Sequence, residues 1–117
     1  MQVHAITKNV RMSAQKMREV VRQIQGLPAM QAQAVLAVVP RKGARVVAKT
    51  LKSAVANAED LKAHKPDYKE MDTDNLYIKE AVAQTASTLR RFTPKARGSA
   101  GPILKRNCHV KITLSDQ

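Results

Sequence analysis

Residues 81–111 limit what this chain can fold into, because they carry seven basic side chains and no acidic one. Positions 83–108 contain only four large apolar residues, which are Leu89, Phe92, Ile103 and Leu104. Such a stretch cannot bury itself in a hydrophobic core, and its proline and glycine residues at positions 94, 98, 101 and 102 are typical of a broad turn. We therefore expect a long β-hairpin at about 83–108, with its tip at about 94–101, that projects from the rest of the chain.

Strand patterns occur at both ends of the chain and beyond its middle. Residues 2–10 are rich in Val, Ile and Thr, and residues 110–114 alternate between apolar and polar side chains. A further strand begins at Leu76. We expect Leu76, Ile78 and Val82 to point to one face of it.

Three segments have the three-to-four spacing of apolar residues that is typical of amphipathic helices. The first begins after Ser13, whose hydroxyl suits an N-cap, and we expect Gly26 to occupy the left-handed position just past its end. The second helix is expected within 28–40, and the third over 44–58, where small apolar residues allow close packing. Residues 60–75 are polar and contain Pro and Asn, so we expect an exposed loop there.

Together these elements predict an α+β fold, in which three helices pack on a small antiparallel sheet and a long β-hairpin protrudes. A length of 117 residues is that of one domain, so we expect a single domain over residues 1–117. Cys108 is the one cysteine, which excludes an internal disulfide. No secretory signal and no apolar run of the roughly 20 residues that span a bilayer is visible, so no membrane partner is expected.

The net charge of +12 is concentrated in two regions of the chain. Residues 1–58 hold ten basic side chains and one acidic one, and residues 81–111 hold seven basic side chains and no acidic one. Residues 59–80, between them, hold four basic and seven acidic side chains. A compact protein with this much positive charge has a polyanion as its expected partner. We expect the two basic regions to face that polyanion and residues 59–80 to face solvent.

The residues that enzymes and metal sites require are missing or badly placed. The sequence has no phosphate-binding glycine loop, and His4, His64 and His109 are too far apart for a metal-ligand motif. Cys108 and His109 are neighbours, but adjacent side chains on a strand point to opposite faces and cannot form a nucleophile–base pair. We therefore expect no catalytic residue, no metal, no cofactor and no enzymatic activity.

The kind of nucleic acid follows from the aromatic content, which is 3% of the residues. Three aromatic side chains cannot form a base-stacking platform, so recognition through the phosphate backbone of a large folded RNA is favoured. An architectural DNA-binding protein is the alternative, and it would bind duplex DNA as well. The candidate contact residues outside the hairpin are Arg11, Lys16, Arg18, Arg22, Lys42, Arg45, Lys49, Lys52 and His109.

Several segments resemble the bacterial family of large-subunit ribosomal protein number twenty-two, in order and with compatible spacing over nearly the whole chain. They are Val10–Arg18, Val47–Glu59, Asp74–Ala81, Leu89–Gly98, Leu104–Arg106 and His109–Ile112. The resemblance implies an α+β domain on the outer face of the large subunit, near the exit of the nascent-peptide tunnel. It also implies a hairpin that lines the tunnel wall, near the site of macrolide antibiotics, and a part in early assembly.

The resemblance further implies the partners and the contact residues. The partners would be large-subunit ribosomal RNA, neighbouring ribosomal proteins and, transiently, the nascent peptide, in a ribosome of the cytoplasm or of an organelle, with no stable homo-oligomer. Carried over by position, the RNA-binding residues would be Arg11, Ser13, Lys16, Arg18, Lys49, Lys52, Asn57, Arg90, Arg91, Lys95, Arg97, Lys105 and Arg106. The tunnel-facing tip would be Lys95, Ala96, Arg97, Gly98, Ser99 and Ala100.

Overall fold

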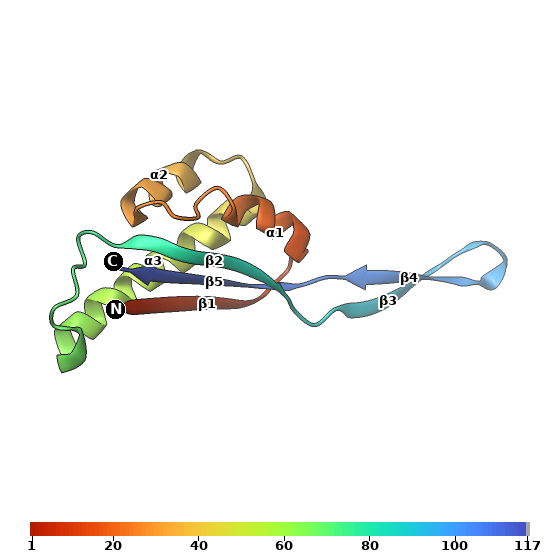
Figure 1. Ribbon diagram of the computed structural model, residues 1–117. Helices are drawn as coiled ribbons and strands as arrows, with labels where there is room; N and C mark the ends of the chain where they lie inside the picture. Colours follow the sequence, from red (N-terminus) through yellow and green to blue (C-terminus); the bar gives the residue numbers. More distant parts are fainter. Residues whose placement is uncertain (117) are drawn as a thin grey trace.

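A two-stranded ribbon projects from a sheet that is covered by helices in the computed structural model, which describes residues 1–116 (Figure 1). The elements in chain order are β1 (Gln2–Val10), α1 (Ala14–Val21), α2 (Ala29–Val38), α3 (Lys42–His64), η1 (Pro66–Tyr68), β2 (Tyr77–Thr85), β3 (Leu89–Pro94), η2 (Ala96–Gly98), β4 (Ala100–Lys105) and β5 (Cys108–Ser115). The molecule measures 67 × 29 × 16 Å. Its radius of gyration of 17.8 Å exceeds the roughly 13 Å of a compact chain of this length, because the ribbon protrudes.

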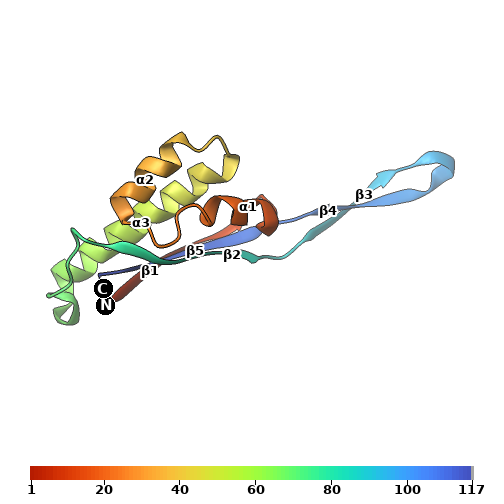
Figure 2. The ribbon, with the colours of Figure 1, turned by 45° about the horizontal axis from the view of Figure 1, so that its top comes forward.

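The main sheet has the strand order β1-β5-β2 and is antiparallel throughout. Its central strand β5 buries Val110, Ile112 and Leu114 completely, which confirms the predicted alternation. Helix α3 packs against β1 and β5, α1 packs against β2, and α2 packs on α3 (Figure 2). The core between helices and sheet is aliphatic, with Met17 and Leu51 fully buried at its centre. The predicted α+β fold with three helices is therefore confirmed.

Helix α1 begins as predicted and ends earlier than predicted. The Ser13 hydroxyl accepts a hydrogen bond from the Lys16 N–H at 3.4 Å, so Ser13 is the N-cap. The helix ends at Val21, and Gly26 lies beyond it with φ +75°. The Gly26 N–H donates to the Ile78 carbonyl at 3.0 Å. The predicted left-handed conformation of Gly26 is therefore confirmed, but Gly26 belongs to a segment that pairs with the edge of β2 and does not directly follow the helix.

This pairing continues along the outer edge of β2. The Ile78 N–H donates to the Leu27 carbonyl at 2.9 Å. The side-chain amide of Gln25 accepts from the Ala81 N–H at 3.2 Å and donates to the Ala81 carbonyl. Since an edge strand with open backbone groups invites pairing with other chains, these contacts protect one side of the main sheet.

Helix α3 is longer than predicted, because it continues through His64 into the segment expected to be a loop. Nothing before Pro66 breaks the helix, and the residue before a proline is forced out of the helical conformation. Lys65 accordingly has extended backbone angles, and a short 3₁₀ turn follows. Met71, in the same predicted loop, is 1% exposed and packs in the core. The expectation of an exposed loop over 60–75 was therefore wrong for its first residues and for Met71.

A β-bulge in β2 reverses the predicted alternation of its side chains. The register with β5 shifts between Ile78 and Glu80. After this bulge Ala81 and Ala83 are buried, whereas Val82 is only half-buried. The prediction that Val82 shares a face with Ile78 was wrong, because the bulge inserts one residue and moves the following side chains to the opposite face.

The predicted hairpin is confirmed, but its separate strands are shorter than the expected 83–108, because residues 83–85 and Cys108 pair within the main sheet. Strands β3 and β4 pair from Leu89–Lys105 to Pro94–Ala100 as a separate two-stranded sheet. They extend from the ends of β2 and β5 and carry their tip far from the helices (Figures 1 and 2). At the turn, Arg97 and Gly98 both have left-handed backbone angles, with φ of 61° and 69°.

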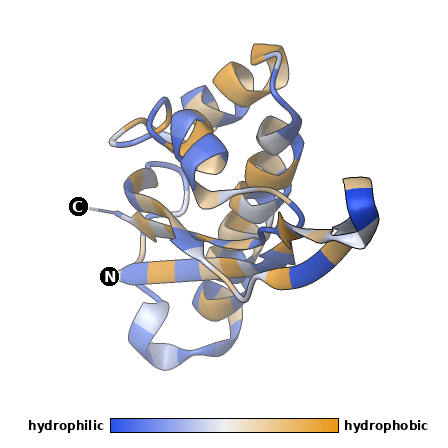
Figure 3. Ribbon diagram, turned by 90° about the vertical axis from the view of Figure 1, so that its right-hand side faces the viewer, coloured by the Kyte–Doolittle hydropathy of each residue, from blue (hydrophilic) through white to orange (hydrophobic). Residues whose placement is uncertain are grey.

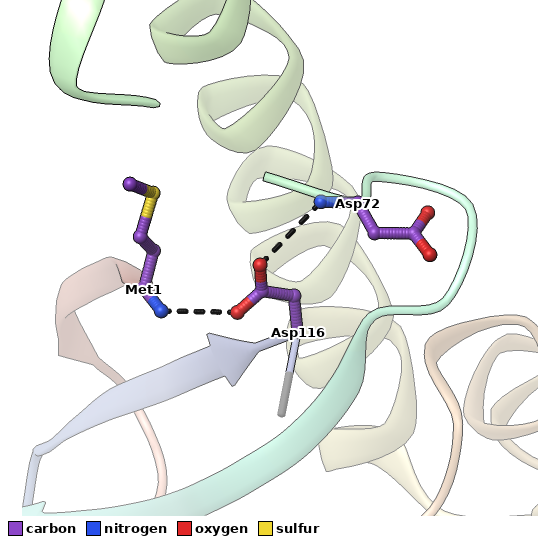
Figure 4. A network of polar contacts seen from close by, with 3 residues as sticks. All are labelled: Met1, Asp72 and Asp116. Carbon is purple, nitrogen blue, oxygen red and sulfur yellow. Dashed lines mark hydrogen bonds and ion pairs between the residues drawn. The ribbon is translucent and has the colours of Figure 1, made fainter. Parts of the chain in front are cut away.

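The two ends of the described chain lie side by side, at the end of the molecule opposite the hairpin (Figure 1). The Met1 amino group donates to Asp116 at 3.0 Å, and the Asp72 N–H donates to the second oxygen of the same carboxylate at 3.4 Å (Figure 4). The hydrogen bond from the amino group lowers the pKa of Asp116 from its ordinary value of 3.8. The pKa of Asp72 is also lowered, mainly by the hydrogen bond from the Asn75 side chain.

Candidate nucleic-acid interface

A basic hollow of about 820 Å³ lies where the start of α1, the start of α3 and the base of the hairpin meet. Five cationic side chains line it, together with one carboxylate, that of Glu19. The cationic residues are Arg11, Lys16, Arg41, Lys42 and Arg106. We call this site the basic hollow. It joins predicted contact residues from three segments that are distant in the sequence.

Local structure fixes the walls of the basic hollow. The Ser13 cap sets the start of α1, so Ser13 has a structural role at the position predicted for RNA contact. The Lys42 ammonium donates to the Arg11 carbonyl at 3.5 Å, which ties the start of α3 to the chain before α1.

Arg41 lines the basic hollow and was not among the predicted contact residues. Its guanidinium forms an ion pair with Glu19 at 3.4 Å. Both side chains are more than half exposed, so this pair contributes little to stability, but it neutralises the carboxylate in the hollow. The sequence signal that identifies Arg41 is its place beside Lys42 directly after Pro40, where a helix begins.

Two predicted contact residues also serve the fold. The Arg18 Nε–H donates to the Ala83 carbonyl at 3.2 Å and so holds α1 against β2. The Asn57 amide donates to the His4 carbonyl at 3.2 Å and holds α3 against β1. Each uses one donor in this way, and a guanidinium retains further N–H groups for a phosphate. Arg22, four residues after Arg18, is exposed.

The basic row of α3 is exposed as predicted. Arg45, Lys49 and Lys52 are exposed, whereas Val47 and Leu51 on the opposite face are fully buried. The core therefore holds the helix while its cationic side chains stay in solvent. Such a row is suited to contact phosphates without rearrangement of the fold.

The hairpin presents basic residues on both of its faces. Arg91 and Lys105 occupy one face, since they alternate with Arg90 on the other face of the ribbon. These side chains are exposed, as are Lys95 and Arg97 at the turn. Figure 3, viewed toward the hairpin, shows hydrophilic residues there in blue.

The tip is closed by its own hydrogen bonds. The Lys95 N–H donates to the Ser99 carbonyl at 2.6 Å, and the Ser99 hydroxyl donates to the Ala96 carbonyl at 2.9 Å. Phe92, near the tip, is 73% exposed, and the other three large apolar side chains of the hairpin are exposed as well, so none of them is buried in a core. A ribbon of this kind needs a partner to hold it in one position.

Cys108 and His109 lie on opposite faces of β5, as predicted. Cys108 is fully buried, and burial raises the pKa of its thiol, so the sulfur stays protonated. His109 is half-buried, and its Nδ1 accepts a hydrogen bond from the Asn9 N–H at 3.0 Å. That bond occupies one ring nitrogen of a predicted contact residue and leaves the other for a phosphate or for solvent.

Within residues 1–116, no three His, Cys, Asp or Glu side chains are grouped so that they could hold a metal ion. No helix in that range is long and apolar enough to cross a membrane.

The comparisons with known proteins agree over the whole chain. The family model described as Ribosomal protein L22p/L17e matches residues 5–115. The large ribosomal subunit protein uL22 of Akkermansia muciniphila is 44% identical over 117 residues, which cover 100% of this chain and 98% of the relative. The uL22 protein of Opitutus terrae is 44% identical over 116 residues, covering 99% and 96%. That of Chloroflexus aggregans is 43% identical over 117 residues, covering 100% and 97%.

Proposed function

Since this chain belongs to the Ribosomal protein L22p/L17e family, we propose that it is a structural constituent of the large ribosomal subunit that binds large-subunit ribosomal RNA. Its role is structural rather than enzymatic. It supports assembly of the subunit, and its hairpin lines the nascent-peptide exit tunnel. The partners are ribosomal RNA, neighbouring ribosomal proteins and, transiently, the nascent peptide.

The observation that carries the proposal is the basic hollow. Its five cations come from three separate segments and surround a space of about 820 Å³. A folded RNA offers several phosphate walls at once, and such a hollow can contact more than one of them. The row Arg45, Lys49 and Lys52 on α3 extends this basic surface along the helix.

The shape of the hairpin supports its proposed place in the tunnel. The longest dimension of the molecule is 67 Å, and the hairpin supplies the part that lies beyond the helices. Its exposed basic residues suit a tunnel wall made of RNA. Its tip, residues 95–100, is then the part nearest to the nascent peptide and to bound macrolides.

An architectural DNA-binding protein remains the competing function from the sequence. The family match favours folded RNA, since the matched family is one of ribosomal proteins. The two functions differ in where the protein is found in the cell. Expression of a tagged chain, followed by separation of ribosomal subunits in a sucrose gradient after a high-salt wash, distinguishes them. We expect the chain in the large-subunit fraction. Recovery with chromosomal DNA instead would contradict the proposal.

The two basic parts are expected to do different work. Lys49→Ala combined with Lys52→Ala removes charge from a rigid helix and should reduce incorporation into the large subunit. Deletion of residues 95–100 should leave incorporation largely intact, because the basic hollow and α3 supply most phosphate contacts. It should instead change the inhibition of translation by macrolides. The amount of chain in purified subunits and macrolide inhibition are the two measurements. The division is wrong if the tip deletion abolishes incorporation while the α3 variant assembles normally.

A further inference from the structure

A second groove lies between the start of α2, the face of α3 that carries Val55 and Glu59, and the start of β2. Its volume is about 560 Å³, and its walls come from α2, α3 and the segment that leads into β2. Pro28, Met30, Val55 and Tyr77 give it apolar walls, and Glu59 and Asp74 add two carboxylates. We call it the α2 groove. It shares no lining residue with the basic hollow.

The charges around the α2 groove are unlike those of any RNA-binding surface. No Lys, Arg or His lines it. Residues 23–40, which include all of α2, contain no charged side chain, although charged residues make up 26% of the chain. Glu59 and Asp74 form no ion pair within residues 1–116. Phosphate groups would be repelled by these carboxylates and would find no cation, so RNA does not suit the groove.

The apolar walls indicate an apolar side chain in the occupant. Met30 is 78% exposed, although it stands on a helix whose other face is packed in the core. Methionine is flexible and adapts to partners of different shape, so it is common at protein-binding surfaces. Gln33 and Asn75 also line the groove and offer amide donors and acceptors to a peptide backbone.

Charge complementarity indicates that the occupant of the α2 groove is positively charged. The whole chain carries a net charge of +12 and repels a basic partner over most of its surface. The exception is residues 59–80, which hold seven acidic and four basic side chains. Glu59 and Asp74 belong to that acidic region. A basic segment is therefore attracted to this groove and repelled by the basic hollow.

We propose that the α2 groove binds an extended, basic segment of another protein, with an apolar side chain between Met30 and Val55 and flanking Lys or Arg residues near Glu59 and Asp74. This interaction rests on the proposed function and deepens it, because it gives the chemistry of one protein partner, and it needs no RNA. It assigns the uncharged helix α2 a partner of its own.

The test is a titration of the purified full-length chain against a fluorescein-labelled peptide, Arg-Lys-Leu-Leu-Lys-Arg, without RNA and at physiological salt. We expect saturable binding by fluorescence anisotropy. Two control peptides replace the leucines by serine or the basic residues by glutamine, and both should bind at least about tenfold more weakly, a difference of about 1.4 kcal/mol. Equal binding of all three peptides overturns the proposal, as does no binding of the first.

Matched variants locate the site. Glu59→Lys with Asp74→Lys should weaken binding of the first peptide about tenfold, because it reverses two attractive charges. Asp67→Lys with Glu70→Lys changes the net charge equally, outside the groove, and should have a much smaller effect. If both pairs act alike, binding is non-specific and the proposal is wrong.

A second pair tests the apolar contact. Met30→Ser should weaken peptide binding several-fold, whereas Val38→Ser, on the same helix and 79% exposed, should not. Both positions are solvent-exposed, so the fold is retained, and circular dichroism checks this. No difference between the two overturns the proposal. A dimer of the full-length chain that Met30→Ser disrupts would make a second copy the occupant, and it would also overturn the proposal.

Discussion

Removal of two cations from the basic hollow should change how RNA binding responds to salt. Of the five cations that line the hollow, Arg41 is paired with Glu19, so four are left to neutralise phosphates. At about 0.7 to 0.9 per phosphate, these four contribute a slope of about −2.8 to −3.6 to the plot of log affinity against log salt concentration. A fourfold rise in salt then lowers affinity about 50- to 150-fold through the hollow alone.

The variant Lys16→Ala with Arg106→Ala removes one wall residue from α1 and one from the base of the hairpin. Its slope should be less steep than that of the unchanged chain by about 1.4 to 1.8. The factor by which the same fourfold rise in salt lowers affinity should therefore be about 7 to 12 times smaller for the variant than for the unchanged chain. Neither side chain is part of the core, so the stability of the fold should not change.

The assay is filter binding of the full-length chain to large-subunit ribosomal RNA over a salt series. The matched control is Lys62→Ala with Lys69→Ala, which removes the same charge from exposed positions in the acidic region. The control slope should stay within about 0.3 of the original, since those residues face no phosphate. Equal slopes for the two double variants would show that net charge alone governs binding, and the assignment of the basic hollow would be refuted.

Three further outcomes are expected. In the free chain, amide exchange across β3 and β4 should be fast, because no large apolar side chain of the hairpin is buried in a core, and should slow when RNA binds; strong protection without RNA would contradict this. Gln25→Ala should lower the free energy of unfolding in urea by about 1–2 kcal/mol, since it leaves both backbone groups of Ala81 without their side-chain partner. Gln23→Ala should have almost no effect, because the Gln23 amide donates to the Glu19 carbonyl four residues before it. Because the folded-state pKa of Asp116 lies below its ordinary value of 3.8, the stabilisation that it provides is present above that pH and is lost as pH falls through the lowered pKa. Asp116→Asn should accordingly lower the melting temperature at neutral pH and reduce its dependence on acid, and an unchanged acid dependence would count against the contact.

The hairpin and β5 were predictable because their signals are local. A basic stretch with few apolar residues has only a projecting conformation available, and alternating Val110, Ile112 and Leu114 fit the centre of a sheet. The position of Gly26 and the side chain direction of Val82 depend instead on pairing with segments about fifty residues away and on a bulge. No periodicity in the sequence encodes these contacts.

Four of the five cations of the basic hollow were predicted from the sequence and Arg41 was missed, and the grouping of the five in one hollow was not predicted. Charge identified Lys16, Lys42 and Arg106 as candidates, and only the folding of three segments together shows that they line one hollow. Arg18 and Asn57 show the opposite case. Their polar side chains suited RNA contact, yet each has a hydrogen bond that holds a helix on the sheet. At such positions the sequence does not show whether a donor group bonds to the protein's own backbone or points into solvent.

The central place of β5 in the main sheet has a consequence for synthesis of the chain. β1 and β2 are synthesised before β5, but they do not pair with each other. Both pair with β5, which lies between them in the sheet. The sheet therefore cannot close until residues 108–115 have been translated. Until then the helices have no complete surface to pack against, and the newly made chain exposes its aliphatic residues together with most of its positive charge. The main sheet thus forms only after β5 has been made, through pairing between segments that are distant in the chain, and until then protection by a chaperone or capture by a polyanion would limit aggregation.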